Sequence, residues 1–291
     1  EKVGDRMKKL HAKNKRKIVI TWIIGIVVFI AAIICVFPFY WMILNSLKNP
    51  DLINSGSASI FTTDLTWESY KAVFAYGDGL LWRAYFNSFL IAALSTIGTL
   101  FTSSMAAFAF AKIRFKGSKP IFGMFIATLM IPGQVTMLPL FMLFAKVGWT
   151  NSFIPLILPG VLINTYGVFM LRSFIVSIPD ELLEAADVDG CSWFRKYRKV
   201  ILPLIKPALV TLGLFTFIGS WNNYMGHLIY LSDPSLTTIP LFIAGLKETH
   251  MTGAVWGQIM AASTLSVIPL AIVYLCCQKY FVQGIATTGI K

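Results

Sequence analysis

One polar segment of this apolar chain, residues 177–207, holds charged side chains in an order that could do chemistry. Five basic residues lie between Arg195 and Lys206. The acidic residues come before them, with no basic residue in between: Asp180, Glu181, Glu184, Asp187 and Asp189. Carboxylates close to an anionic membrane surface are poorly placed for contact with lipid. We therefore expect an acidic knob that binds a protein partner. An ordinary solvated loop is the alternative.

The residue order in this segment predicts a short helix that ends in a sharp turn. Ser177, with Asp180 three residues later, is typical of a helix start. The helix should end at Gly190, because glycine adopts the left-handed conformation of a helix terminus without strain. Ser192 can then begin a second short helix.

Side-chain groupings typical of catalysis, metal binding or nucleotide binding are absent from the sequence. The three histidines lie far apart, at His11, His227 and His250, so they form no ligand cluster or catalytic pair. No Gly-Lys dipeptide occurs, which excludes a P-loop. We expect that this chain is not an enzyme and binds no cofactor or metal itself.

The composition indicates a membrane protein. Of 291 residues, 56% are hydrophobic and only 13% are charged, and the mean hydropathy is +0.71. A soluble domain would be nearer a quarter charged. These values exclude a disordered chain and a cytosolic enzyme. The 4 cysteines are too few and too scattered for a disulfide-stapled secreted domain.

Six stretches without Asp, Glu, Lys or Arg are long enough to cross a membrane, since ~20 apolar residues span a ~30 Å hydrocarbon core. Inside lipid the backbone must satisfy its own hydrogen bonds, so we expect an all-α protein with six transmembrane helices. The third and fourth stretches are separated only by Lys146, which predicts a tight helical hairpin. Prolines such as Pro132 and Pro159 predict kinks or breaks within them. The stretches are Ile18–Leu47, Ala84–Ala111, Pro120–Ala145, Val147–Leu171, Pro207–Ser232 and Met251–Gln278.

The basic residues predict the orientation of these spans. Twenty of the 25 lie on one side, in the tail 1–17, the second-to-third and fourth-to-fifth connections and the C-terminal end. By the positive-inside rule that side is cytoplasmic, and both termini are on it. The net charge of +12 therefore needs no nucleic-acid partner. The first apolar run is too long for a signal-peptide core, so we expect an uncleaved first span.

The spans lack the fixed charges that a proton- or ion-coupled transporter usually holds inside its helices. His227 is the one candidate, and we expect it near the outer end of the fifth span with water as its partner. A secondary transporter is thereby disfavoured.

The charged segment also carries a long, gapped motif. Glu184-Ala185-Ala186 is followed after three residues by Gly190, and after nine more by Val200-x-Leu202-Pro203. This pattern resembles the EAA signature of importer-type ABC permeases, with valine in place of the usual first isoleucine. The similarity covers the chain from about Thr63 to Lys291.

Further motifs resemble the MalG-type permease subunits of carbohydrate-uptake ABC importers. Two departures are His227, where such permeases often carry proline, and Thr288, where the tail often has glycine. The matching motifs are Asn87-Ser88, AAFAFAKIRFKG at 106–117, Ile131-Pro132 with Pro139-Leu140, SFIPLILPG at 152–160, Trp221-Asn222-x-Tyr224, TTIPL at 237–241 and YFVQGIATTGIK at 280–291.

The resemblance implies a type I ABC importer permease, with residues 18–291 as the permease domain. Within 177–207 it implies a coupling helix that docks on an ATPase subunit. The implied coupling residues are Glu184, Ala185, Ala186, Asp189, Gly190, Leu202 and Pro203. The cytoplasmic tail 280–291 would reach between two ATPase subunits, through Gln283, Gly284, Gly289 and Lys291; a frayed terminus is the alternative.

The partners implied by the resemblance complete a bacterial membrane complex. They are a second homologous permease, two ABC ATPase subunits that bind ATP and Mg, an extracytoplasmic solute-binding protein and a sugar, taken to be an oligosaccharide. The alternatives are an ABC permease for another solute such as glycerol phosphate, a secondary transporter or channel acting alone, and a membrane scaffold without transport.

Aromatic and amide side chains of the spans are the candidates for contact with a sugar, because aromatic faces pack on sugar rings and amides bond hydroxyls. Alternatively the aromatic residues anchor the chain at the membrane interface, the amides join helices, and the partner permease holds the sugar. The candidates are Asn87, Ser88, Trp221, Asn222, Asn223 and Tyr224.

The orientation predicts which positions a membrane-impermeant thiol reagent reaches. In a variant without the native cysteines, cysteines placed at Gly56 or Ser235 should react from outside intact cells, and one placed at Ser118 should not. Labelling at position 118 from outside would show that the number of spans or their direction is wrong.

Overall fold

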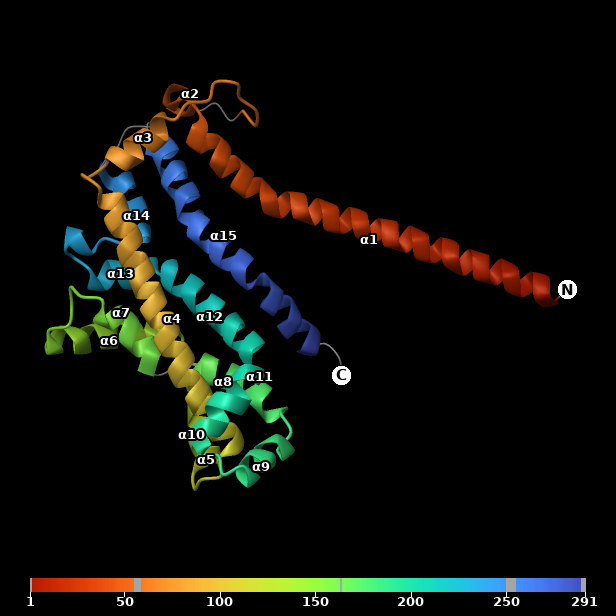
Figure 1. Cartoon of the computed structure of the whole chain (residues 1–291). Helices are drawn as coiled ribbons and strands as arrows, with labels where there is room; N and C mark the ends of the chain where they lie inside the picture. The colour runs from red at the N-terminus through yellow and green to blue at the C-terminus, as the bar shows by residue number, and fades with distance from the viewer. Residues whose placement is uncertain (1, 55–58, 163, 250–254, 289–291) are drawn as a thin grey trace. The chain divides into compact units, whose positions relative to one another are not determined.

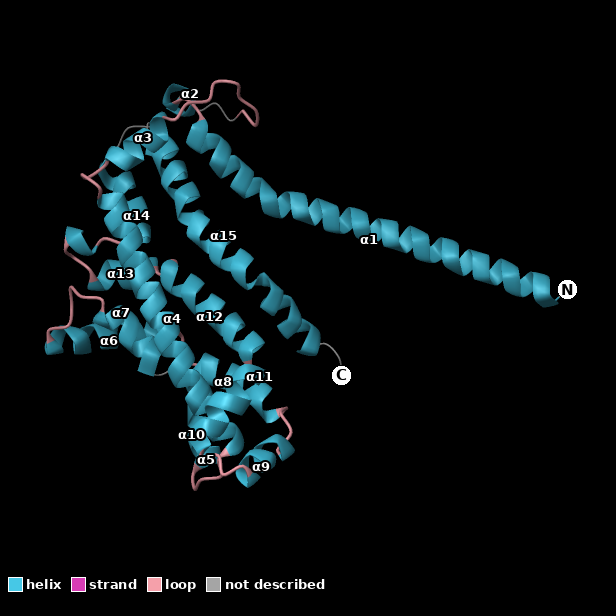
Figure 2. Cartoon of the chain, in the orientation of Figure 1, coloured by secondary structure: helices cyan, strands magenta, loops and turns pink. Residues whose placement is uncertain are grey.

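The computed structural model describes residues 2–54, 59–162, 164–249 and 255–288 (Figure 1). The elements in these ranges are helices joined by loops, without a strand (Figure 2). They divide into two compact units, one within residues 1–72 and 250–264 and the other within 73–249 and 265–291. The predicted all-α class is confirmed.

The first unit is built on α1 (Lys2–Leu47), a helix that contains the whole first predicted span. A short helix, α2 (Pro50–Asn54), follows it. The start of α3 (Glu68–Ala75) returns to the end of α1, where the Tyr70 and Ser46 hydroxyl oxygens lie 2.8 Å apart.

The second unit contains the helices that carry the charged segment and the polar residues of the spans. α15 begins in the first unit and continues in the second. The elements of the second unit are α4 (Leu80–Lys112), α5 (Ser118–Thr128), α6 (Gly133–Val147), α7 (Ile154–Leu162), α8 (Thr165–Val176), α9 (Glu181–Val188), α10 (Trp193–Lys196), the π-helical turn η1 (Tyr197–Ile201), α11 (Leu202–Leu204), α12 (Lys206–Trp221), α13 (Tyr224–Tyr230), the 3₁₀ turn η2 (Pro234–Leu236), α14 (Ile239–Thr249) and α15 (Val255–Thr288).

The long helix α4 is the centre of this unit, because α7, α8, α12 and α14 all pack on it. Its 33 residues span about 50 Å at ~1.5 Å per residue. Many of the side chains that α4 buries are small: Ala84, Ser88, Ala92, Ser95, Thr99, Ser103, Ser104 and Ala107. Small side chains at helical spacing let neighbouring backbones approach closely, as membrane helix packing requires.

Hydroxyl groups of α4 bind the carboxyl end of α7. Thr99 donates to the Gly160 carbonyl at 3.0 Å, and Thr102 donates to the Val161 carbonyl at 2.6 Å. The last backbone carbonyls of a helix have no hydrogen-bond partner within that helix, and lipid chains offer no donor. The hydroxyls of α4 supply the missing donors to α7. Gly98 lies at the same contact, where an added Cβ would come within 2.4 Å of Val161.

Within the described residues, four helical stretches are long and apolar enough to cross a membrane, or up to six if each of two bent pairs forms one span. One pair is α5 and α6, which meet at 98°. The bend lies where Pro132 was predicted to break the third stretch. The other pair joins the α10–α11 segment to α12 at 80°.

The fifth predicted span, Pro207–Ser232, is wrong as a single helix. α12 ends at Trp221, and α13 begins at Tyr224. The Asn223 side chain caps α13 by accepting a hydrogen bond from the Gly226 amide at 3.0 Å. Asparagine side chains favour such caps over a continuous helix, so Asn223 in the sequence already indicated a break here.

The tight hairpin predicted between the third and fourth spans is also wrong. The chain turns sharply after α6 at Gly148 and Asn151, both with positive φ. However, α7 packs on α4 and α13 rather than along α6. The side chains of α6 instead contact α13, where the Phe141 and Phe144 ring centroids lie 5.9 and 5.8 Å from that of Tyr230.

The close contact at Gly98 predicts that alanine destabilises the protein at this position but not at Gly219. Gly98→Ala should lower thermal stability by about 1–3 kcal/mol, because the stiff Val161 side chain cannot yield to a new methyl group. Gly219→Ala in α12 meets nothing within 4 Å and should be neutral or stabilising. Thermal unfolding of the detergent-solubilised protein measures both. Equal unfolding temperatures for the two variants would contradict the contact, and Val161→Ala should rescue Gly98→Ala.

Candidate functional site

The charged segment begins where α8 ends, and its helix starts later than the sequence indicated. The Ser177 hydroxyl donates to the Phe174 carbonyl at 2.7 Å, so it serves the end of α8. Asp180 precedes α9, and its backbone carbonyl accepts from Leu183 at 2.9 Å and Glu184 at 3.0 Å. The prediction that Ser177 starts this helix is therefore wrong, because its hydroxyl is already used by the preceding helix.

The predicted helix end at Gly190 is confirmed. Gly190 has φ +66°, and its amide donates to the Asp187 carbonyl at 2.9 Å. The Cys191 amide then donates to the Ala186 carbonyl at 2.9 Å. This pattern satisfies the last carbonyls of α9 and reverses the chain sharply, with Asp189 at the turn.

The helix α9 has a buried side and an exposed side. Leu183 is buried in an apolar core formed with α4, α8, η1 and α12, and Ala186 is buried beside it. Ala185, Leu182 and Val188 are exposed, and Val188 exposes 90% of its surface. Residues three apart on a helix share a face, so the exposed residues form an apolar stripe that nothing in the described chain covers.

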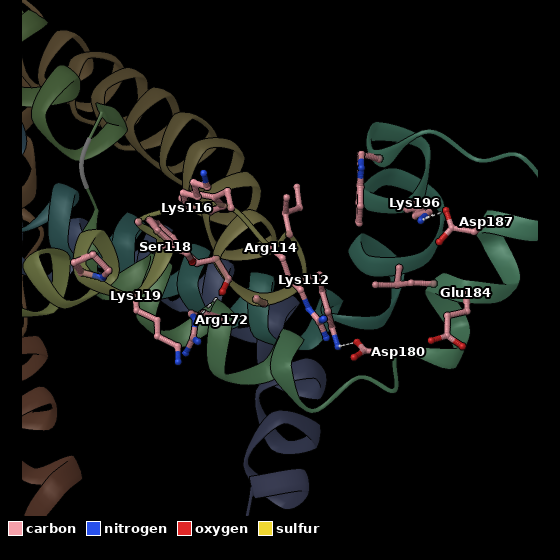
Figure 3. A pocket seen from close by; sticks show the side chains of 18 residues that line it. Lys112, Arg114, Lys116, Ser118, Lys119, Arg172, Asp180, Glu184, Asp187 and Lys196 are labelled. Atoms are coloured by element: carbon pink, nitrogen blue, oxygen red, sulfur yellow. Dashed lines mark hydrogen bonds and ion pairs between the residues drawn. The ribbon is translucent and has the colours of Figure 1, made fainter.

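Two lysines hold the carboxylates at either end of α9 (Figure 3). Lys112, at the end of α4, donates to Asp180 and to the Ile178 carbonyl, each at 2.6 Å. Lys196 on α10 forms an ion pair with Asp187. The hydrogen bond and the charge of Lys112 lower the pKa of Asp180 below its usual value. Because this pKa is lowered, the stabilisation by the pair is complete at a pH above the pKa of Asp180 in the unfolded chain, and it is lost as the pH falls through the lower pKa of the folded protein.

These residues line a cavity of about 850 Å³ between the α4–α5 turn and α9. Glu184 faces it from the middle of α9, between the two ion pairs (Figure 3). Among the described residues Glu184 has no ion-pair partner. The opposite wall is strongly basic and includes Arg114, Lys116 and Lys119.

The chain after Gly190 leads back to the spans. Ser192 precedes α10 as predicted, although its hydroxyl makes no capping bond. The Tyr197 hydroxyl lies 2.7 Å from the buried Ser104 hydroxyl of α4. Leu202 and Pro203 form α11, where Leu202 is half-buried and Pro203 is exposed.

Three of the six candidate residues for contact with a sugar are engaged in holding the fold. The Asn87 amide donates to the Ser235 and Thr237 carbonyls at 3.0 and 2.8 Å. The Ser88 hydroxyl accepts from the Ile239 amide at 2.8 Å. Asn223 is the cap of α13.

The other three, Trp221, Asn222 and Tyr224, line a small pocket of about 180 Å³. Trp221 is 1% exposed and stacks on Phe217 at 5.9 Å between ring centroids. It is therefore packed inside the unit instead of lying at the surface. A complete ligand site usually occupies ~300–1,000 Å³, so this pocket has room for only part of a larger molecule.

The sequence indicated that His227 faces water, and the structure shows that it does not. It is 1% exposed, and its Nδ1 lies 2.9 Å from the Thr238 hydroxyl. Its Nε2 has no hydrogen-bond partner in the described part of the chain. The prediction was wrong because α13 packs against α14 and covers the ring.

The predicted tail residues are only partly within the described chain. Gln283 and Gly284 lie in the backbone of α15, which is described to Thr288. Gly289 and Lys291 lie outside the described residues. Among the described residues no group of three or more His, Cys, Asp or Glu could hold a metal ion.

Comparison with known proteins identifies a family match over most of the second unit. Residues 98–287 match the family described as binding-protein-dependent transport system inner membrane component. This range includes α9, Gly190 and the ion pair of Lys112 with Asp180.

Two curated relatives match nearly end to end. The trehalose/maltose transport system permease protein MalG of Thermococcus litoralis is 36% identical, covering 89% of this chain and 93% of the relative. The sn-glycerol-3-phosphate transport system permease protein UgpE of Salmonella typhi is 32% identical, covering 87% and 91%.

A solved structure shares the fold. It is a chain of a bacterial ABC transporter involved in the import of the acidic polysaccharide alginate, with a TM-score of 0.77 and 23% identity. The likeness covers 90% of this chain and 96% of that chain.

Proposed function

Because the chain belongs to the family of inner-membrane components of binding-protein-dependent transport systems, we propose that it is a permease subunit of an ATP-driven sugar importer. It forms part of the translocation pathway for an oligosaccharide. Its own role is not catalytic, because ATP and Mg are bound by partner subunits. Relatives named for trehalose and maltose support the sugar assignment.

The exposed face of α9 is the observation that carries the proposal. Leu182, Ala185 and Val188 offer an apolar stripe, and Glu184 beside it offers a carboxylate without an ion-pair partner in the described chain. A short, rigid helix with this surface fits the cleft of an ATPase subunit, where a basic side chain can pair with Glu184. We assign α9 as the coupling helix.

The remaining partners follow from the family. A second homologous permease completes the pathway, two ATPase subunits supply the energy, and an extracytoplasmic solute-binding protein delivers the sugar. The end of α4 at Lys112 and both termini face the cytoplasm, which the excess of basic residues on that side supports. The tail, with Gln283, Gly284, Gly289 and Lys291, makes a second contact with the ATPase subunits.

Trp221, Asn222 and Tyr224 form a minor part of the sugar pathway. Their pocket is too small for an oligosaccharide, so the partner permease supplies the rest of the site. Asn87, Ser88 and Asn223 act on the pathway indirectly, by fixing the loops around it.

Glycerol phosphate is the second candidate substrate, because a similar relative is named for its transport. None of the described residues that line the pocket at Trp221 is basic and could pair with a phosphate, which favours the sugar. Uptake of a labelled oligosaccharide panel and of glycerol phosphate, by cells that express the complete importer, separates the two. Uptake driven by a proton gradient without ATP would point instead to a transporter acting alone.

Glu184→Lys and Gly190→Asp should each abolish uptake while the protein still inserts into the membrane. Glu184→Lys replaces an attractive pair by repulsion, which costs several kcal/mol, or roughly a hundredfold or more, if the pair is desolvated. Gly190→Asp places a side chain at φ +66°, at a cost of ~1–2 kcal/mol. Uptake, co-purification of the ATPase subunits and membrane content measure these effects.

A control separates this docking surface from charge in general. Lys199→Gln changes an exposed basic residue of the same segment and should leave uptake near the normal level. Normal uptake by both α9 variants at normal expression would overturn the coupling-helix assignment.

Asn222→Ala and Tyr224→Ala should each lower uptake about tenfold without loss of the complex, because each removes a contact of ~1–1.5 kcal/mol with the sugar. Asn223→Asp keeps the oxygen that caps α13 and should behave normally. The measurement is the initial uptake rate over a range of sugar concentrations. Unchanged rates in both alanine variants would remove this pocket from the pathway.

A further inference from the structure

The attachment of α9 to the rest of the permease depends on one side chain of α4. Lys112 bridges two consecutive parts of the chain, because it donates to the Ile178 carbonyl just after α8 and to the Asp180 carboxylate just before α9. The Lys112 side chain is 6% exposed, although the Asp180 carboxylate lies at the surface. The ammonium group is thus held at one place from two sides.

A second attachment lies at the other end of α9. The Lys196 side chain is 2% exposed and pairs with Asp187. Its ammonium nitrogen also lies 4.3 Å from the centre of the Trp193 ring, which favours a cation at that position. The first and last turns of α9 are therefore both fixed by lysines that belong to other helices.

Lys112 and Lys196 differ from other basic residues that line the same cavity, because their side chains are buried. An exposed ion pair contributes little, because water screens it and both side chains lose freedom. A buried ammonium group that loses its partner leaves an uncompensated charge, which is costly. Lys116 and Lys119 lie a few residues beyond Lys112, are exposed, and have no ion-pair partner among the described residues.

We propose that Lys112 and Lys196 are positioning residues that fasten the two ends of α9, and that Lys112 transmits displacement of α9 directly to α4. The proposal rests on the coupling role of α9 proposed above. A helix held at one end only would rotate about Gly190 when an ATPase subunit moves it. Held at both ends, it moves α4, and with α4 the helices α7, α8 and α12 that pack on it.

The test compares Lys112→Met with Lys116→Gln in the complete importer reconstituted into lipid nanodiscs. Methionine keeps most of the length and the apolar stem of lysine but makes neither bond. We expect Lys112→Met to assemble with its ATPase subunits and to lose about tenfold of the ATPase activity stimulated by the loaded solute-binding protein. The loss is less than that for a fully buried pair because Asp180 is exposed. Lys112→Arg should restore stimulation, and Lys116→Gln should retain it.

A spectroscopic measurement detects the position of α9 independently of transport. Spin labels at Glu181→Cys and Lys119→Cys, both exposed sites outside the apolar stripe, report the distance between α9 and the α4–α5 turn by electron–electron double resonance. A narrow distance distribution is expected in the unaltered protein and in Lys116→Gln. Lys112→Met and Lys196→Met should each broaden it.

The outcomes separate this proposal from the proposed function. Lys112→Met with normal stimulation, or with an unchanged distance distribution, overturns the positioning role even if Glu184→Lys abolishes uptake. Normal uptake in Glu184→Lys overturns the coupling role itself. If Lys112→Met does not assemble, Asp180→Asn decides, since it weakens the same bond from the exposed side. An unchanged distribution in Asp180→Asn counts against the proposal.

Discussion

The close approach of neighbouring helices to α4 is the interaction on which the second unit depends. Helices gain little hydrophobic energy from one another in lipid, so packing and interhelical hydrogen bonds must hold them. Glycine at position 98 and small side chains along α4 leave room for α7, and the hydroxyls of Thr99 and Thr102 bind its last carbonyls. The result is a central helix whose neighbours move with it.

Both candidate functional regions are tied to this helix, one near each end. Near its start, Asn87 and Ser88 bind the backbone between Ser235 and Ile239, beside the pocket of Trp221. At its end, Lys112 binds the start of α9. In the proposed coupling role, a displacement of α9 would therefore reach the region of the pocket through α4 itself, without a chain of intermediate contacts.

Features that depend on local residue order could be predicted from the sequence, and features that depend on tertiary contacts could not. Gly190 ends α9 because glycine, which has no Cβ, adopts φ +66° at little steric cost, and the sequence alone indicates this. By contrast, Ser177 has the right type for a helix start but bonds backwards to α8. In the sequence, Lys112 and Lys196 indicate only which side of the membrane their loops are on. Their burial depends on how α8, α9 and α10 fold around them.

The separation of charge along the segment also has a structural explanation. Its basic half folds back on its acidic half, and Lys196 neutralises Asp187. Lys112, from outside the segment, neutralises Asp180 at the other end. The central Glu184 then remains as a carboxylate without an ion-pair partner among the described residues, next to the exposed Val188. The paired carboxylates hold α9 in position. In the proposed coupling role, the unpaired Glu184 would select the ATPase partner, so separate residues would set the rigidity and the specificity of one short helix.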